Sequence, residues 1–224
     1  MNRKMKKMLA ASENRATFFA RVELRYSRYS KEYQFIEKAY NVAKDAFRHV
    51  VREDGTRYFE HVRAVAIIQM DYLNIFDLKF LIIPAHEVVA AALLHDTPED
   101  CPEWPLSRIE LEFSANVAWL LDYVSKRPRA DFGGDKIIQL KFYHDHLRYV
   151  ELVEVFLIKL PDRWHNQLTL WSCKIEKIER KNNETIEIYI PLARQWNILF
   201  HELVATTEDH KERLTKHMNQ CVTA

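Results

Sequence analysis

The stretch Ala91-Ala92-Leu93-Leu94-His95-Asp96-Thr97-Pro98-Glu99-Asp100 decides the interpretation of this chain. It ends an apolar run that begins at Val88 and is typical of a buried helix. An imidazole and three carboxylates follow that run within six positions. Because charged groups at the end of a core helix must be paired or bound to a metal, we expect a polar site inside the core.

Two further segments complete a set of metal-binding side chains. They are Tyr58-Phe59-Glu60-His61 and Leu160-Pro161-Asp162-Arg163. Taken singly, His61 is typical of a core histidine, and Asp162 could simply pair with Arg163. Together with His95 and Asp96 they give two imidazoles and two carboxylates from the margins of three predicted helices. Such a nitrogen and oxygen site suits Mn, Fe, Co or Zn better than Ca or Mg.

Glu99 and Asp100 lie about one helical turn beyond His95 and Asp96. A carboxylate beside a metal-bound water can accept its proton, since the metal lowers the pKa of that water from ~15.7 towards ~7. The sequence therefore predicts a catalytic role for both acids. Capping of a helix, or a solvated loop position, is the alternative.

Composition limits the function further. The 224 residues carry a net charge of +1 and are 48% hydrophobic, which favours a single soluble domain acting on a small molecule, with no nucleic-acid or membrane partner. Only three glycines are present, too few for a phosphate-binding glycine-rich loop. Phosphate chemistry would therefore rest on a metal and on cationic side chains. Oligomeric state cannot be inferred from the sequence.

Cysteine spacing and the N-terminus indicate a cytoplasmic protein. Cys101, Cys173 and Cys221 are scattered without metal-binding spacing, so we expect reduced thiols. The basic segment 1–7 resembles the start of a signal peptide, but polar residues 12–15 interrupt it before any adequate apolar region. We expect a frayed basic tail, and no apolar run approaches the ~20 residues of a membrane span.

The chain is predicted to be all-α, a helical bundle with the metal site in its centre. Ser30 or Ser27 is expected to cap the first long helix. We divide the chain into a partly helical extension (1–30), one hydrolase domain (31–210) and a tail (211–224). The loop at 127–134 could be a mobile flap. Helices are predicted at 31–51, 57–73, 84–95, 107–124, 136–149, 152–171, 183–196 and 198–210.

Some other polar residues are less informative. His144-Asp145-His146 contains a second His-Asp pair, but it lies in a polar stretch and is predicted to be a solvated helix face. For His165, a packing role or a supporting role behind the ligands is favoured over direct ligation.

The motifs together resemble the hydrolase domain of the RelA/SpoT alarmone family, in its small stand-alone form. The resemblance runs from about Phe35 to about Phe200, and the chain ends at Ala224, too early for the synthetase domain of two-domain members. The matching segments are 52–61, 91–100, 121–126, 157–166 and 184–193.

The resemblance implies a manganese-dependent hydrolase that removes the 3′-pyrophosphate of guanosine tetra- or pentaphosphate. It implies one ion held by His61, His95, Asp96 and Asp162, with Glu99 and Asp100 activating the water. It implies that Arg52 lies against the nucleobase and that Asn166 and Thr169 hold the nucleoside. Further candidates for substrate contact in the same segments are Glu53, Tyr58, Lys159 and Arg163.

Two departures from the family pattern leave alternatives open. The family commonly has a basic residue where this chain has Glu53, and a proline where it has Val62. Glu53 either points to solvent or pairs with Arg57 or Arg63, or it faces the pocket and reads a base edge. The rival functions are hydrolysis of another nucleotide, such as ppApp, NADPH or a deoxynucleotide, and a regulatory module that binds a nucleotide without turnover.

Overall fold

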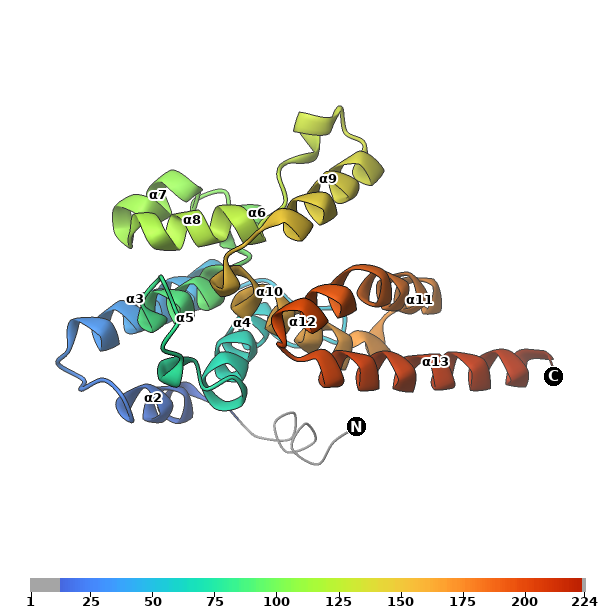
Figure 1. The fold of residues 1–224 in the computed structure, drawn as a ribbon, viewed down its shortest axis with the longest axis horizontal. Helices are drawn as coiled ribbons and strands as arrows, with labels where there is room; N and C mark the ends of the chain where they lie inside the picture. The colour runs from blue at the N-terminus through green and yellow to red at the C-terminus, as the bar shows by residue number, and fades with distance from the viewer. Residues whose placement is uncertain (1–12, 223–224) are drawn as a thin grey trace.

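The computed structural model describes the backbone of residues 13–222 and the side chains of residues 13–216. The basic segment 1–7 lies outside these residues. Within them the fold is helical, with one isolated β-bridge and no strand, which confirms the all-α prediction (Figure 1). The helices are α2 (Arg15–Glu23), α3 (Lys31–Ala46), α4 (Tyr58–Ile67), α5 (Ala85–Leu94), α6 (Thr97–Asp100), α7 (Leu106–Glu112), α8 (Ala115–Val124), α9 (Lys136–Tyr149), α10 (Val153–Leu168), α11 (Ile175–Glu184), α12 (Ile190–Trp196) and α13 (Phe200–Val222).

Helices α5 and α10 form the centre of the molecule. α5 packs against α3, α4, α8 and α10, while α10 also contacts α12 and α13. Figure 1 shows α10 between an N-terminal group of helices and the group α11–α13. Every residue from Val88 to Leu94 is buried. Ala90, Ala91 and Ala92 are small, which lets neighbouring helices approach α5 closely. The end of α5 therefore meets α10 inside the core.

Helix α3 begins where the sequence predicts and ends earlier. The Ser30 hydroxyl accepts a hydrogen bond from Tyr33 N at 3.1 Å, which confirms the predicted cap. The helix ends at Ala46 and not at Val51, because Val51 forms the β-bridge with Arg57. Gly55, at a φ of 79°, supplies the turn between them. This turn places Arg52 ahead of α4.

Two helix predictions need correction. The helix predicted at 107–124 is divided at Ser114, which is extended and accepts from Val117 N at 3.1 Å to begin α8. The helix predicted at 183–196 begins at Ile175 as α11 and continues through a π-helical turn at Thr185–Tyr189, labelled η5, into α12. A serine cap inside an apolar pattern and a polar helix both escape a search for apolar periodicity.

Pro161 lies inside α10, one residue before Asp162. A proline has no N–H, so the carbonyl of Leu157 loses its helical donor. Gln69, in the π-helical turn η1 (Ile68–Tyr72), donates its side-chain N–H to Leu157 O at 2.8 Å. This buried contact replaces the missing bond and keeps α10 satisfied up to Asp162.

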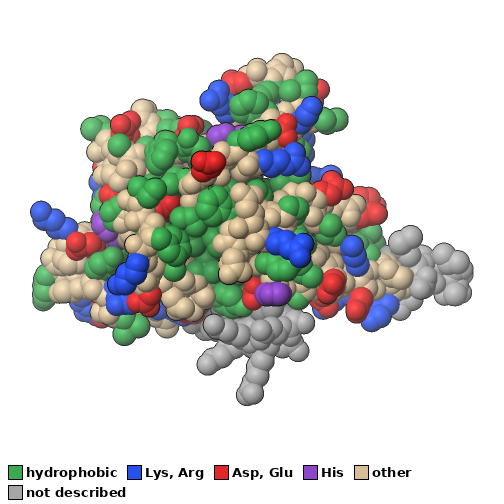
Figure 2. Space-filling view, in the orientation of Figure 1, with side chains coloured by type: hydrophobic (Ala, Val, Ile, Leu, Met, Phe, Trp, Pro, Cys, Tyr) green, Lys and Arg blue, Asp and Glu red, His purple; other side chains and the backbone are tan. Residues whose placement is uncertain are grey.

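The segment 127–134 contains a short 3-10 turn (Arg129–Phe132), and it projects with α9 from the body of the molecule (Figure 1). The role of this segment as a flap stays a prediction. The division of the chain at residues 30 and 210 also stays a prediction, and α13 continues across residue 210. Figure 2 shows acidic and basic side chains interspersed over one face, in keeping with a net charge of +1. No described helix is long and apolar enough to cross a membrane.

Candidate metal centre and nucleotide pocket

Three side chains from three different helices meet in the core. His61 lies in the first turns of α4, His95 directly follows α5, and Asp162 lies in α10. One ligand atom of each lies within 4.8 Å of the others, and all three residues are buried. His61 Nε2 lies 3.2 Å from Asp162 Oδ1, and His95 Nε2 lies 3.6 Å from the same oxygen.

The donor atoms of this cluster fit a divalent cation. The Nε2 atoms of His61 and His95 are buried and make no hydrogen bond of acceptable geometry. His95 Nδ1 lies 2.9 Å from Ala92 O, which can only accept, so Nδ1 carries the proton in the neutral ring. The lone pair of His95 Nε2 is then free for a metal. A mixed set of imidazole nitrogens and a carboxylate oxygen suits a transition metal.

Asp96 lies at the edge of the same cluster. Its Oδ2 is 3.0 Å from His95 Nε2 and 3.7 Å from His61 Nε2, and it accepts a hydrogen bond from the Tyr58 hydroxyl at 2.7 Å. Burial alone would raise the pKa of Asp96, but His95 and His61 outweigh it and hold the pKa well below its usual value. Asp96 is therefore a candidate for the fourth donor, and the second oxygen donor, next to the two imidazoles.

Asp162 is fixed from both sides. Lys159 Nζ pairs with Oδ2 at 2.9 Å, and Asn166 Nδ2 donates to Oδ1 at 2.6 Å. Burial would raise the pKa of Asp162, but Lys159 and the two imidazoles lower it well below its usual value. The carboxylate is thus held ionised, as a metal ligand requires.

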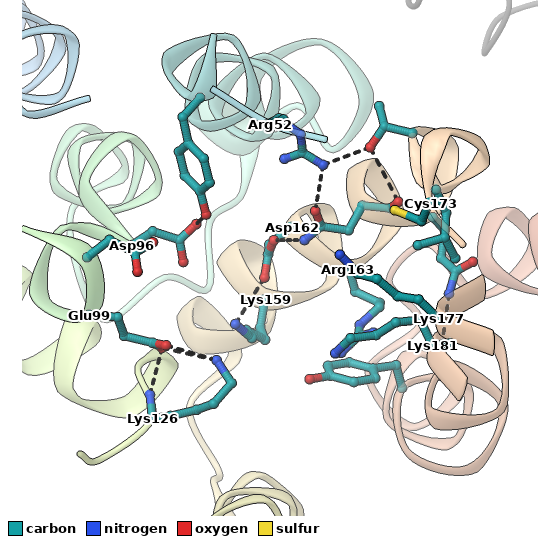
Figure 3. A pocket seen from close by; sticks show the side chains of 17 residues that line it. Arg52, Asp96, Glu99, Lys126, Lys159, Asp162, Arg163, Cys173, Lys177 and Lys181 are labelled. Carbon is teal, nitrogen blue, oxygen red and sulfur yellow. Dashed lines mark hydrogen bonds and ion pairs between the residues drawn. The ribbon is translucent and has the colours of Figure 1, made fainter. Parts of the chain in front are cut away.

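A cavity of about 250 Å³ opens above these groups (Figure 3). Asp96 and Glu99 form one wall, and Arg163, Lys177 and Lys181 form the wall across from it. The remaining lining comes chiefly from α10 and from the turn that follows it. Of the predicted site residues, it includes Arg52, Tyr58, Asp96, Glu99, Asp100, Lys159, Asp162, Arg163, Asn166 and Thr169.

The three predicted nucleoside contacts lie together at one end of this cavity. Arg52 Nη2 donates to Asn166 Oδ1 at 3.0 Å and to Thr169 Oγ1 at 2.8 Å. Through Asn166 the guanidinium of Arg52 is connected to Asp162, so the Arg52 end of the cavity and the His-His-Asp cluster share one chain of hydrogen bonds. An adjoining cavity of about 290 Å³ shares Arg52, Asn166 and Thr169 with the first.

The two predicted catalytic acids both line the cavity but have different neighbours. Glu99 Oε1 accepts from the backbone N of Lys126 at 2.8 Å, and Lys126 Nζ lies 3.0 Å from Oε2. Asp100 is an exposed residue, but desolvation of its carboxyl group, followed by the charges of Asp96 and Glu99, raises its pKa. Glu99 is therefore paired with Lys126, while Asp100 lies near the negative charges of Asp96 and Glu99.

Arg163 on α10 was expected at the site from the sequence, but its two cationic neighbours in the cavity wall, Lys177 and Lys181 on α11, were not. Glu184 Oε1 lies 3.0 Å from Arg163 Nη2, Glu184 Oε2 lies 2.7 Å from Lys181 Nζ, and the guanidinium of Arg163 lies 3.9 Å from the ring centre of Tyr189. Burial, followed by the charge of Arg163, lowers the pKa of Lys181 to about 8. The basic spacing of Lys177 and Lys181, one helical turn apart and followed by Glu184, is the signal that could have indicated a pocket wall.

Glu53 and His144 have partners that the sequence did not predict. Glu53 is exposed and pairs with Lys177 Nζ at 2.6 Å, not with Arg57 or Arg63, which both pair with Glu60. Lys177 is distant in sequence, so no local pattern identifies it. His144 is not on a solvated helix face: it is largely buried, with Nε2 3.3 Å from Glu184 Oε1.

His165 packs behind the cluster. Its Nδ1 lies 2.9 Å from His61 Nδ1, on the side of the His61 ring away from the carboxylates. Burial, followed by His61 and Arg52, lowers the pKa of His165 well below its usual value.

Comparison with known proteins decides the family. The model of the HD domain family matches residues 39–199. The chain belongs to the HD domain family. This HD domain is 38% identical over 159 residues to guanosine-3′,5′-bis(diphosphate) 3′-pyrophosphohydrolase of Haemophilus influenzae, covering 70% of the chain and 22% of that relative. It is 37% identical over 164 residues to the bifunctional (p)ppGpp synthase/hydrolase SpoT of Escherichia coli, covering 73% of the chain and again 22% of the relative.

These relatives confirm the predicted resemblance to the RelA/SpoT hydrolase domain, and the chain spans about a fifth of their length. A solved structure described as a metazoan ortholog of SpoT that hydrolyses ppGpp matches with a TM-score of 0.67 at 19% identity. The match covers 82% of this chain and 98% of that chain, which confirms the fold.

Proposed function

We propose that this HD domain hydrolyses the 3′-pyrophosphate of guanosine tetra- or pentaphosphate, giving GDP or GTP and pyrophosphate. One observation carries the proposal: Asp162 of the buried cluster and the adjacent Asp96 line a cavity whose opposite wall is cationic, and the two imidazoles lie directly behind these carboxylates. A phosphorylated nucleotide is the ligand that such a pair of walls fits. The names of the relatives support the choice of a guanosine bis(diphosphate).

We assign one divalent ion, manganese by preference, to His61, His95, Asp96 and Asp162. When bound there, it would supply Lewis acidity to the phosphoryl group and to the attacking water. The side chains of the chain perform the other parts of the reaction. Arg52, Asn166 and Thr169 hold the nucleoside, while Lys159 and Arg163 bind phosphate oxygens.

In the proposed reaction, water attacks the phosphorus attached to the 3′-oxygen, and the bond between that phosphorus and the 3′-oxygen breaks. Glu99 or Asp100 accepts the proton of the water. The released 3′-oxygen then takes up a proton, and pyrophosphate leaves. Tyr58, through its hydrogen bond to Asp96, keeps that carboxylate oriented during the reaction.

The test is release of pyrophosphate from ppGpp by the whole chain with Mn²⁺, before and after a chelator. We expect activity to disappear with the chelator and to return best with Mn²⁺. His61→Ala should abolish both ion binding and turnover, whereas His201→Ala, at an exposed position on α13, should leave both unchanged. Full activity in metal-free buffer would contradict the proposal.

A substrate panel separates the rival functions. Faster release of phosphate or pyrophosphate from ppApp, NADPH or a deoxynucleotide would assign another substrate to the same chemistry. Tight binding of ppGpp without turnover would assign a regulatory module.

A further inference from the structure

The two imidazoles of the metal cluster are supported in different ways. His95 Nδ1 faces the carbonyl of Ala92, which belongs to its own helix turn and can only accept a hydrogen bond. Among the described residues His61 has no such carbonyl: the group facing its Nδ1 is the ring nitrogen of His165, at 2.9 Å. Two ring nitrogens at this distance share one proton, so one donates and the other accepts.

The direction of this hydrogen bond follows from the other nitrogen of His61. His61 Nε2 faces Asp162 and Asp96, at 3.2 and 3.7 Å, and it is buried without a hydrogen bond of acceptable geometry. A neutral imidazole that presents a lone pair at Nε2 carries its proton at Nδ1. His61 therefore donates to His165, and the side chain of His165 accepts as the Ala92 carbonyl does for His95.

We propose that His165 is a positioning residue for the metal centre: its Nδ1 accepts the Nδ1 proton of His61 and thereby fixes both the tautomer and the ring orientation of that ligand. The proposal rests on the assignment of a divalent ion to this site. His165 itself would not touch the ion, because its Nδ1 lies against His61 and its ring is tilted on the His61 ring, with centres 4.9 Å apart.

The position of His165 makes this support rigid. It lies three residues after Asp162 on α10, one helical turn away, so a single helix holds one ligand directly and another through a hydrogen bond. Partners of this kind typically change metal affinity by about 10–100-fold when they are removed. The next residue, Asn166, donates a hydrogen bond to Asp162 Oδ1, so Asp162 has a support of its own that is separate from the one His165 gives to His61.

The experiment measures Mn²⁺ affinity by titration calorimetry, without substrate. We expect His165→Phe to weaken Mn²⁺ binding by about 10–100-fold. His165→Gln, whose amide oxygen can accept the same proton, should recover most of that loss. His201→Phe is the matched control and should bind Mn²⁺ as the wild type does. A His165→Phe variant that is folded by circular dichroism and binds within twofold of the wild type would overturn the proposal.

A second measurement does not depend on any variant folding. Long-range ¹H–¹⁵N NMR of the Zn²⁺-loaded wild type should show the His61 proton on Nδ1 and the His165 proton on Nε2. A His165 proton on Nδ1 would overturn the proposal. Wild type that binds neither ion would remove it together with the metal assignment, whereas wild type that binds Mn²⁺ but does not cleave ppGpp would remove only the proposed function.

Discussion

Lys126 contacts Glu99 twice, through its backbone N–H at 2.8 Å and its side-chain nitrogen at 3.0 Å. The segment that follows α8 thus sets the direction in which the Glu99 carboxylate points. Because the backbone N–H is one of the two contacts, we expect the orientation of Glu99 to persist when the Lys126 side chain moves away. Asp100 makes no ion pair among the described residues, and desolvation, followed by the charges of Asp96 and Glu99, raises its pKa.

Glu99→Gln tests the role of the paired acid. The amide keeps the shape and the contact with the backbone N–H of Lys126 but cannot take a proton. We expect Mn²⁺ binding to persist and kcat to fall by about 10²–10⁴-fold. Glu103→Gln, at an exposed position near by, is the control. If kcat falls only after Asp100→Asn, the proton acceptor is Asp100 and Glu99 has a positioning role.

Lys126→Met tests whether this contact matters during turnover. Residues that act as one unit have non-additive effects, so the double variant with Glu99→Gln should lose little more than Glu99→Gln alone. The measurement is a double-mutant cycle on kcat/KM for ppGpp. Additive losses would show that Lys126 acts on the substrate independently of Glu99.

Lys181 predicts a pH dependence of substrate binding. Burial and Arg163 lower its pKa to about 8, so the ammonium is charged below pH 8 and loses its charge as the pH rises through 8. KM for ppGpp should therefore rise above pH 8. Because Lys181 lines the cationic wall of the cavity, we expect it also to bind a phosphate oxygen of ppGpp. Lys181→Met should therefore raise KM at pH 7 by about tenfold to a hundredfold, from the loss of a hydrogen bond between charged groups of ~1.5–3 kcal/mol. The ratio of the Lys181→Met KM to the wild-type KM should then shrink above pH 8. The control Lys141→Met, on the exposed face of α9, should leave KM at its wild-type value at every pH.

The Glu53 and Lys177 pair predicts a small effect. Both side chains are more than a third exposed, and such pairs contribute little. We expect Glu53→Gln to change kcat/KM about twofold or less, and equally on ppGpp and ppApp. A loss confined to ppGpp would show instead that the carboxylate reads the guanine edge.

Gln69 predicts a stability effect that depends on Pro161. Gln69→Met leaves the buried Leu157 carbonyl without a donor, which should lower the free energy of unfolding by about 1–3 kcal/mol. In a Pro161→Ala background the new N–H of residue 161 can reach Leu157, so the same change should cost less. Urea denaturation of the wild type, the two single variants and the double variant measures the free energy of unfolding. An equal loss from Gln69→Met in both backgrounds would show that Gln69 does not replace the missing N–H of Pro161.

The sequence predicted those parts of the site that local pattern determines. The apolar run before His95 and the acids after it form a continuous segment. Charged groups at the end of a buried helix must be paired or bound to a metal, so this segment alone indicates a site. The fold class and the capping role of Ser30 followed from local rules in the same way. The break at Ser114 was missed, because apolar spacing continues across it.

Contacts between distant segments could not be predicted in this way. Lys177 meets Glu53 across 124 positions, and the support of Leu157 by Gln69 spans 88. Such pairs depend on how helices cross, which periodicity along one helix does not determine. The part of the cationic wall that α11 contributes was missed for the same reason, since α11 is polar and carries no strong apolar signal.

Helix α10 carries Lys159, Asp162, His165 and Asn166 over two turns, and its C-cap is Thr169. Deleting one residue within that interval would rotate everything beyond it by about 100° and shift it by about 1.5 Å. The proposed metal ligand Asp162, the proposed supporting residue His165 and the proposed nucleoside contacts Asn166 and Thr169 would then lose their relative positions together. Substrate preference in this chain can therefore change by side-chain substitution or by changes in the loops around the cavity. Insertions and deletions within α10 between these positions would disrupt the site.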